Sequence, residues 1–392
     1  MSARAAAPLP YGARVLIAGG GFAAVEAMLA LRELAGERVT IDVVSLHRRF
    51  AYRPSATGEP FDDVPPLAYD LAEIAEDLGA RHRVDRVEAV APAVGHVRLA
   101  SGARLAYDTL VLAFGAQLRT SVAGALMFTG QRDVAHIRNL LDELTRGAVH
   151  DVVFAVPAGV SWPLPLYELA LLTGGFVRKR GLAADVSIVT PERAPLEVFG
   201  ERAGALVREL LDECGVRFLA RRTPDRVHRD GRLTLRWPAA ELDADRVIAV
   251  PNMVGREIPG IPRSLYGFVP TDDRGRVYGL EDVYAAGDMT TYPIKQGGLA
   301  AQQADAIAAD IAARVSRAPA PEPRERVLSA RLIGGPRPVE LHVTLDGAGR
   351  ARDARIATLA PGEVPPVSEK VFGRYLVPYL RRRRPADAAV AV

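Results

Sequence analysis

A glycine-rich stretch near the N-terminus has the residue types of a phosphate-binding turn. Gly19-Gly20-Gly21-Phe22-Ala23-Ala24 follows an apolar run and precedes a sequence with helical periodicity. Glycine lets the backbone approach a pyrophosphate closely, and the N-terminus of the following helix stabilises its negative charge. The order of strand, glycine turn and helix favours this interpretation over a tight turn without a ligand.

The expected contact to a ribose is the weakest part of this pattern. Folds of this kind usually carry an acidic residue at the end of the second strand, where it holds a ribose hydroxyl. Here Ser45 occupies that position, with His47 just beyond it, and Asp42 lies earlier, within the expected strand. The sequence therefore predicts phosphate binding more firmly than ribose binding.

Two later strand ends carry groups suited to holding a cofactor. Residues 108–116 read as an apolar strand running into a glycine turn, and residues 283–288 as a strand ending in Gly287-Asp288. Each could be an ordinary strand end, but an aspartate there can accept from a sugar hydroxyl or cap the next turn of the chain. Gln296-Gly297-Gly298 then begins a long helix, whose N-terminus could face a developing negative charge.

The elements that must position these residues form two similar units. Residues 14–46 read strand, glycine turn, helix, strand, and residues 151–190 repeat that order, with a further helix at 201–213. The remaining segments expected to return to the first sheet are strands within 82–91, 96–100, 108–114, 245–250 and 283–288, and a helix at 299–315. The second unit would then be an insertion in the first.

Beyond residue 316 the sequence changes character. Residues 317–326 are rich in proline and charge, as linkers are. Two strands are expected at 327–333 and 338–346, and residues 367–380 read as a short amphipathic segment. The basic run Arg381 to Arg384 follows it, and either touches acidic lipid head groups or is a solvated terminus.

Composition excludes several classes of protein. A chain of 392 residues, 49% apolar and 25% charged, exceeds one core and is typical of a water-soluble globular protein with at least two domains. With no long apolar run and no signal-like start, we expect no transmembrane helix and a cytoplasmic location. Its net charge of +3 comes from dispersed arginines, which does not indicate nucleic-acid binding.

Thiol and metal chemistry are also restricted. The single cysteine, Cys214, cannot form an intramolecular disulfide, and it lies at the expected end of a helix, where a packing role is favoured. The seven histidines show no ligand spacing, so no metal site is predicted.

These motifs together resemble the pyridine nucleotide-disulfide oxidoreductase superfamily of two-dinucleotide-domain flavoproteins. The resemblance covers roughly residues 13–314 and is carried by GGGFAAVEAMLAL, YRPS with GEPF, LVLAFGA, and VYAAGDMTTYPIKQGGLAAQQAD. It is nearest to the sulfide:quinone reductase and type II NADH dehydrogenase branch. The implied fold class is α/β, with two Rossmann-like FAD/NAD(P)-binding domains of three-layer ββα type, the second inserted in the first, and a small α+β C-terminal segment. The implied boundaries are 1–119 and 244–316 for the FAD domain, 120–243 for the insertion and 317–392 for the C-terminal segment.

The resemblance also implies a set of FAD-contacting residues. Gly19, Gly21, Phe22 and Ala23 would hold the pyrophosphate, Ser45 and His47 would lie near the ribose, and Val87 near the adenine. Arg53 and Pro54 would lie along the cofactor, with the turn of Ala113, Phe114 and Gly115. Gly287 and Asp288 would contact the ribityl chain, and Gln296, Gly297 and Gly298 the edge of the flavin. Phe114 replaces the threonine of the family's Ala-Thr-Gly turn.

Departures from the family pattern bear on the reaction. The second turn, residues 157–165, keeps only Gly159, and its prolines remove N–H donors that a second pyrophosphate would use, so NAD(P)H is expected to bind weakly at most. Trp162 lies about where a redox cysteine would be, which argues against persulfide chemistry; the tryptophan stacks on or gates the flavin, or belongs to the core. Glu168 is either a proton relay or a charge at a helix start. Lys295, one of three lysines, is favoured for a specific role near the flavin.

Two functions remain open at this point. The first is an FAD-dependent oxidoreductase that passes electrons from a donor, with NAD(P)H as a candidate, to an acceptor such as a quinone, without a redox disulfide. The second is an FAD-binding electron-transfer subunit that works with a partner redox protein, as in flavocytochrome c. A homodimer and peripheral contact with the inner face of a membrane are also left open.

Overall fold

Two five-stranded parallel sheets organise the molecule. The computed structural model describes residues 7–62, 66–360, 365–383 and 385. The first sheet has the order β20 (Val283–Ala285), β9 (Thr109–Leu112), β1 (Ala13–Ala18), β2 (Val39–Ser45) and β5 (Arg81–Val84). The second has the order β11 (Leu126–Met127), β18 (Arg246–Ala249), β12 (Asp151–Ala155), β13 (Asp185–Val189) and β14 (Val216–Leu219).

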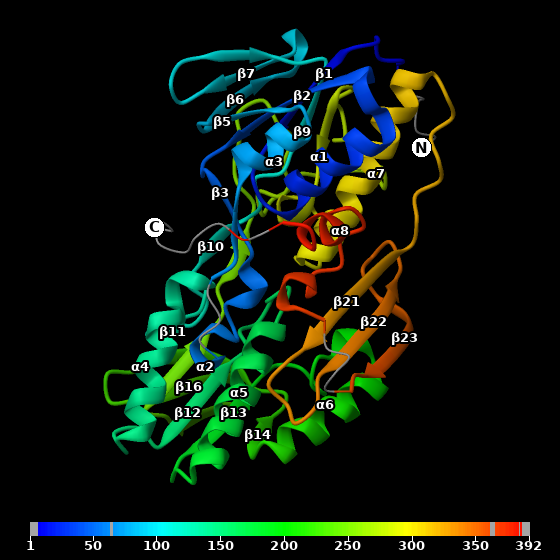
Figure 1. The fold of residues 1–392 in the computed structure, drawn as a ribbon. Helices are drawn as coiled ribbons and strands as arrows, with labels where there is room; N and C mark the ends of the chain where they lie inside the picture. Colours follow the sequence, from blue (N-terminus) through cyan, green and yellow to red (C-terminus); the bar gives the residue numbers. More distant parts are fainter. Residues whose placement is uncertain (1–6, 63–65, 361–364, 384, 386–392) are drawn as a thin grey trace.

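The first sheet lies between a helical layer and a second β-layer (Figure 1). Helices α1 (Phe22–Ala35) and α7 (Gly297–Ser316) pack together on one face, where alanine and leucine side chains interlock. The antiparallel strands β6 (Val87–Ala91), β7 (His96–Leu99) and β8 (Arg104–Ala106) cover the other face. A hairpin, β3 (Arg49–Ala51) and β4 (Ala68–Asp70), encloses the short α2 (Glu59–Asp62) and leads into α3 (Leu71–Asp77).

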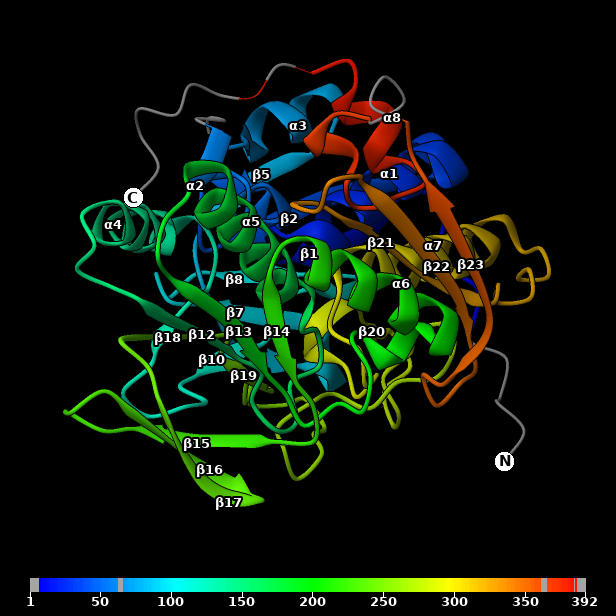
Figure 2. The same ribbon diagram turned by 90° about the horizontal axis from the view of Figure 1, so that it is seen from below.

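The second sheet repeats this three-layer arrangement. Helices α4 (Val134–Thr145), α5 (Leu164–Arg180) and α6 (Glu201–Glu213) form one hydrophobic core with it. The antiparallel strands β15 (Thr223–Val227), β16 (Arg232–Trp237) and β17 (Ala239–Asp243) pack against the opposite side (Figure 2). The predicted α/β fold class with two ββα units is therefore confirmed.

One strand lies in a different sheet from the one predicted. Residues 245–250 were expected to return to the first sheet, but β18 lies between β11 and β12 in the second. Ile248 and Val247 alternate between the two cores of the second unit, and an apolar strand of this kind suits any parallel sheet. The chain crosses between units through a short ribbon, β10 (Gln117–Arg119) antiparallel to β19 (Asn252–Val254). We therefore propose the insertion boundaries at this ribbon rather than at residues 120 and 243.

The C-terminal segment adds a third, antiparallel sheet of β21 (Arg326–Leu332), β22 (Val339–Leu345) and β23 (Ala351–Thr358). The first two strands were predicted; β23 was not, because nearly all of its residues are exposed and its sequence lacks apolar alternation. The sheet packs its apolar face into the core of the second unit. Helix α8 (Leu376–Leu380) follows this sheet and packs in the core beside α1.

The basic run at the end of the chain is largely neutralised where it is described. Arg381 pairs with Glu369 at 2.6 Å and Arg383 with Glu73 at 3.0 Å, while Arg384 lies outside the described residues. Among the residues that the structure covers, no helix has the length and apolar character needed to cross a bilayer.

Candidate functional site

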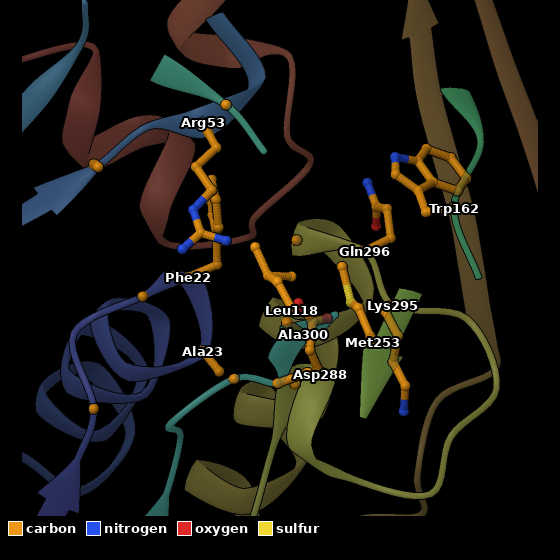
Figure 3. Close-up of a pocket in the computed structure, with 18 of the residues that line it drawn as sticks. Phe22, Ala23, Arg53, Leu118, Trp162, Met253, Asp288, Lys295, Gln296 and Ala300 are labelled. Carbon is orange, nitrogen blue, oxygen red and sulfur yellow. The ribbon is translucent and has the colours of Figure 1, made fainter. Parts of the chain in front are cut away.

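A cavity of about 500 Å³ lies where the strands of the first sheet end, facing the second unit. Ligands of open α/β sheets bind at this edge, outside the carboxyl ends of the strands. Every residue predicted for the site except Gly298 lines this cavity. Figure 3 shows Phe22 and Arg53 on one side and Trp162 and Gln296 on the other. The structure therefore brings these predicted residues, from segments almost 300 positions apart, to the wall of one cavity.

The first glycine turn leaves space where a phosphate would lie. Gly19 has a φ of +145°, and a Cβ there would stand 2.1 Å from the carbonyl oxygen of Ala113, so this glycine is required by strand packing. Gly21 precedes α1 with an ordinary φ of −98°, and a Cβ there would meet nothing within 4 Å. No side chain caps this helix, so its first N–H groups are available at the cavity edge.

At the ribose end, the predicted side chain is already engaged. The Ser45 hydroxyl donates to the carbonyl oxygen of His47 at 2.6 Å and lies 2.8 Å from Nε2 of His82. Asp42 is paired with Arg81 at 2.7 Å, as expected for a residue inside the strand. The only proton of the Ser45 hydroxyl is thus used within the protein, which weakens the prediction that this side chain holds a ribose.

At the opposite end, Asp288 lines the cavity, and within the described ranges its carboxyl group interacts with Lys295 and Arg53 only through their charges. Burial raises the pKa of its carboxyl group, and the positive charges of Lys295 and Arg53 oppose that rise. Gln296 has a structural role at the start of α7, where its Oε1 accepts from the N–H of Leu299 at 2.9 Å. Asp288 is thus the acceptor that remains available for a ligand hydroxyl.

Lys295 holds the loop rather than pointing its charge into the cavity. Its Nζ donates to the carbonyl oxygens of Thr290 and Tyr292 and lies 4.0 Å from the centroid of the Phe268 ring. Figure 3 shows the amino group directed away from Trp162 and Gln296. Burial lowers the pKa of Lys295 to about 8, opposed by Asp288. We therefore assign it a positioning role for the loop that carries Asp288.

Glu168 forms a buried ion pair that the sequence did not predict. Its Oε2 lies 2.6 Å from Nζ of Lys370 and accepts from the Thr57 hydroxyl at 2.8 Å; the two charged side chains are only 1% and 5% exposed. Burial raises the pKa of Glu168, and the Lys370 ammonium opposes that rise. The pair joins α5 to the C-terminal segment on the cavity wall, so it can hold a proton there.

Side chains in and after the second turn, residues 157–165, contact other parts of the protein. Trp162 lines the cavity and packs its ring edge against Phe199, with centroids 6.0 Å apart. Pro163 precedes α5 and offers no cap, and Tyr167 in the first turns of that helix donates to Glu192 at 2.5 Å. Glu192 follows β13, where an acid would hold a second ribose. The Tyr167 hydroxyl already donates a hydrogen bond to the Glu192 carboxylate, which competes with a ribose hydroxyl for this acid. The second turn is therefore a poor match for a tightly bound dinucleotide.

Among the cavity residues that sequence reasoning missed are Lys370 and Arg256. Lys370 carried a signal, since lysine is rare in this chain, whereas Arg256 is one of many dispersed arginines. Nε of Arg256 is buried without a hydrogen-bond partner in the described part of the chain. Arg53 likewise lines the cavity with no ion pair to any described carboxylate.

The residues present fit FAD. Arg53 and Arg256 have no carboxylate partner among the described residues, and their guanidinium groups, the open space at Gly21 and the uncapped start of α1 suit a diphosphate, because cationic side chains and helix N-termini bind phosphate. The carboxylate of Asp288 suits a sugar-like hydroxyl at the other end of the cavity. The second turn offers no comparable set for NAD(P)H.

Known proteins resemble this chain in sequence and in fold. Two curated relatives are similar at the sequence level. The biphenyl dioxygenase system ferredoxin–NAD(+) reductase component of Paraburkholderia xenovorans (strain LB400) is 27% identical over 260 residues, covering 60% of this chain and 56% of the relative. The ferredoxin reductase component of chlorobenzene dioxygenase from Cupriavidus sp. (strain PS12) is 28% identical over 304 residues, covering 69% and 68%. This chain thus spans little more than half the length of the first relative.

The fold has counterparts among solved structures. The sulfide:quinone oxidoreductase of Aquifex aeolicus superposes with a TM-score of 0.76 at 19% identity, over 88% of this chain and 87% of the other. The family model for pyridine nucleotide-disulphide oxidoreductases matches residues 13–306, which include both parallel sheets and the whole of the first glycine turn. The chain therefore belongs to the pyridine nucleotide-disulphide oxidoreductase family.

Proposed function

We propose that this protein is an FAD-dependent oxidoreductase that draws electrons from a nicotinamide donor and delivers them to a partner redox protein. The observation that carries the proposal is one continuous cavity running from the glycine turn to Asp288, with two guanidinium groups on its wall that have no carboxylate partner in the described part of the chain. FAD is the cofactor of this family and supplies the electron-transfer chemistry when bound. The protein's own residues supply binding, orientation and proton control.

Each part of the cavity has a distinct proposed task. Arg53, Arg256 and the N–H groups that begin α1 bind the diphosphate. The loop braced by Lys295 presents Asp288 to a sugar-like hydroxyl. Glu168 and Lys370 hold a proton at the cavity wall, and Trp162 excludes water from the side of the second unit.

A nicotinamide donor is supported by family membership and by the relatives' names, and its binding is proposed to be weak. The prolines of the second turn remove N–H donors that a phosphate would use, and the acid after β13 is engaged by Tyr167. A dinucleotide would therefore be held mainly at its nicotinamide end, between Trp162 and Met253. We expect a high KM for NADH and NADPH rather than no reaction.

A redox protein is favoured over a quinone as the acceptor. Both curated relatives are ferredoxin reductase components, whereas the quinone-linked structure supports the fold alone. The chain's single cysteine is buried, with a pKa raised by burial, so no dithiol can relay the electrons.

The first test concerns the cofactor. The purified protein should carry FAD, and Arg256→Gln should weaken FAD retention about tenfold, as expected for loss of one charge-assisted hydrogen bond. Arg263→Gln is the matched control, because Arg263 is exposed and pairs with Glu257 outside the cavity. Well-folded protein that stays colourless with added FAD would contradict the proposal.

The second test concerns donor and acceptor. NADH and NADPH are added anaerobically while the oxidised flavin absorbance is followed, and the reduced protein is then mixed with an iron–sulfur protein or a soluble quinone. We expect bleaching only at high donor concentration and faster reoxidation by the iron–sulfur protein. No bleaching by either nucleotide would remove the nicotinamide donor, and faster reoxidation by the quinone would reverse the choice of acceptor.

A further inference from the structure

The C-terminal segment forms part of the cavity wall beside Phe22 and the turn that begins α7. Lys370 and Val371 line the cavity, and the N–H of Val371 donates to the Tyr52 hydroxyl at 2.8 Å. The segment also covers the turn that begins α7, since a Cβ added to Gly297 would stand 3.3 Å from Cγ1 of Val371. The position of residues 370–372 therefore sets the shape of the cavity at this end.

A buried carboxylate anchors this segment a few residues further on. Glu26, on α1, is fully buried, and its two oxygens accept from the N–H groups of Tyr375 and Leu376, both at 2.8 Å. These N–H groups lie at the start of α8, where a helix supplies no partner of its own. No ion pair to Glu26 is found within the described ranges. The anchor to the C-terminal segment is thus an acid that accepts from two backbone N–H groups.

A second acid lies against the first. Asp305 projects from α7 beside Glu26, and its Oδ1 is buried without a hydrogen-bond partner among the residues described. Two adjoining buried carboxyl groups cannot both be ionised without a large cost. Burial, reinforced by Glu26, raises the pKa of Asp305 to about 8. Near neutral pH the pair therefore carries one proton, which Asp305 can donate to Glu26.

The other charged groups around the pair do not cancel this effect. Arg374 in the C-terminal segment and Arg324 after α7 favour the ionised form of Asp305. Glu33 on α1 and the Tyr375 hydroxyl are the remaining titratable neighbours, and burial raises the pKa of that tyrosine. The upward shift at Asp305 is what remains after both arginines have acted.

We propose that Glu26 and Asp305 are positioning residues of the cofactor site, which share one proton and thereby hold residues 370–376 against the cavity. Loss of that proton leaves two adjoining carboxylates, and their repulsion weakens the bonds from Glu26 to the start of α8. The wall at Lys370 and Val371 then loosens. The anchor follows from the fold alone, and its meaning for FAD rests on the proposed function.

The sign of the pH effect is given by linkage. Asp305 has a higher pKa in the folded than in the unfolded protein. Its contribution to the stability of the anchored segment is therefore fully present below the unfolded pKa near 4 and is lost as pH rises through the folded pKa of about 8. The segment should therefore loosen on the alkaline side only. An acid-side loosening would need a different group.

Amide hydrogen exchange of the full chain, as purified, tests the anchor directly. Protection factors at Tyr375 and Leu376, corrected for intrinsic exchange, should fall about tenfold between about pH 6.5 and about pH 9, one unit past the titration. Asp305→Asn keeps a neutral donor beside Glu26 and should remove this fall. The FAD dissociation rate, followed by flavin fluorescence, should rise over the same range in the wild type and stay level in the variant.

Each result of the exchange experiment either supports or overturns the proposed anchor. Equal protection of the wild type at both pH values overturns the proposal, and so does an undiminished fall in Asp305→Asn. If that variant does not fold, Glu26→Gln provides the second measurement. A glutamine side chain cannot accept from both backbone N–H groups as the carboxylate does, so the protection factors of Tyr375 and Leu376 should already be lowered at about pH 6.5. A chain that binds no FAD would refute the proposed function, yet the exchange result could still be read.

Discussion

The two glycine turns occupy equivalent places in two similar units, yet their chemistry differs. After the first turn, α1 begins without a cap and Gly21 faces open space. After the second, Pro163 precedes α5, Tyr167 bonds to Glu192, and Glu168 pairs with Lys370. Both helices begin without a side-chain cap, but the polar side chains that follow the second turn are bonded within the protein, whereas the start of α1 is left for a ligand. Changes at the first should cost binding, and changes at the second should cost stability.

The largest effect is expected where the second turn is tied to the C-terminal segment. Lys370→Met leaves Glu168 as a buried charge without its partner, which should lower the free energy of unfolding by about 3–5 kcal/mol. Because burial raises the pKa of Glu168, that deficit should be largest near neutral pH and shrink as pH falls and the carboxyl group is protonated. Urea unfolding at several pH values measures it.

Two variants check the interpretation of that result. Glu168→Gln combined with Lys370→Met should recover much of the lost stability, since no buried charge remains. Arg381→Met, which removes an exposed partner of Glu369 on the same segment, should change the free energy of unfolding little, because solvent screens an exposed ion pair. A Lys370→Met deficit no larger than this control would show that the buried pair does not support the second unit.

A smaller effect is expected at the first turn, and on binding rather than stability. Gly21→Ala adds a methyl group in an ordinary backbone conformation where no protein atom lies within 4 Å, so the fold should persist. The methyl group would meet a bound diphosphate, at a cost of roughly 1–3 kcal/mol, or about ten- to hundredfold in FAD affinity. Fluorescence titration of stripped protein measures this.

The control for this change is Gly347→Ala. Gly347 also has open space around it, and it lies in the turn between β22 and β23, away from the cavity. Its FAD affinity should match the wild type. Unchanged affinity in Gly21→Ala would show that the first turn does not approach the cofactor, and the contrast between the two turns would disappear.

The smallest effect is expected at Glu192. If its carboxylate serves Tyr167 rather than a ribose, Glu192→Gln should change the KM for NADH less than about threefold, well below the tenfold expected for a lost charged contact. Glu197→Gln is the neighbouring control, because Glu197 is exposed and accepts only from a backbone N–H. A tenfold rise in KM at Glu192 alone would place a dinucleotide on the second turn after all.

Much of this site could be predicted because its signals are local. A glycine turn between strand and helix, or a Gly-Asp at a strand end, is visible in a few consecutive residues, and the family resemblance brings such segments together. The bonding state of a side chain is not visible in this way. Ser45 and Lys295 had suitable positions, but the groups that engage them, such as His82 and the carbonyl oxygen of Tyr292, are set by packing.

The missed features depend on long-range contacts. Lys370 meets Glu168 across 202 positions of the chain, and no periodicity reports such a pair. Strand β18 has the same apolar sequence whichever parallel sheet receives it, so its neighbours β11 and β12 could be found only in three dimensions. Strand β23, exposed on most of its residues, is held by pairing to β22 rather than by its own side chains.

The ribbon formed by β10 and β19 has a consequence for how such a molecule could arise. Arg119 and Asn252 are register partners, so the chain leaves and re-enters the first unit at neighbouring points. Opposed residues in an antiparallel pair lie only about 5 Å apart, a gap that a two-residue hairpin can close. A duplicated ancestral module could therefore have been spliced in at a loop without disturbing the order of strands in its host.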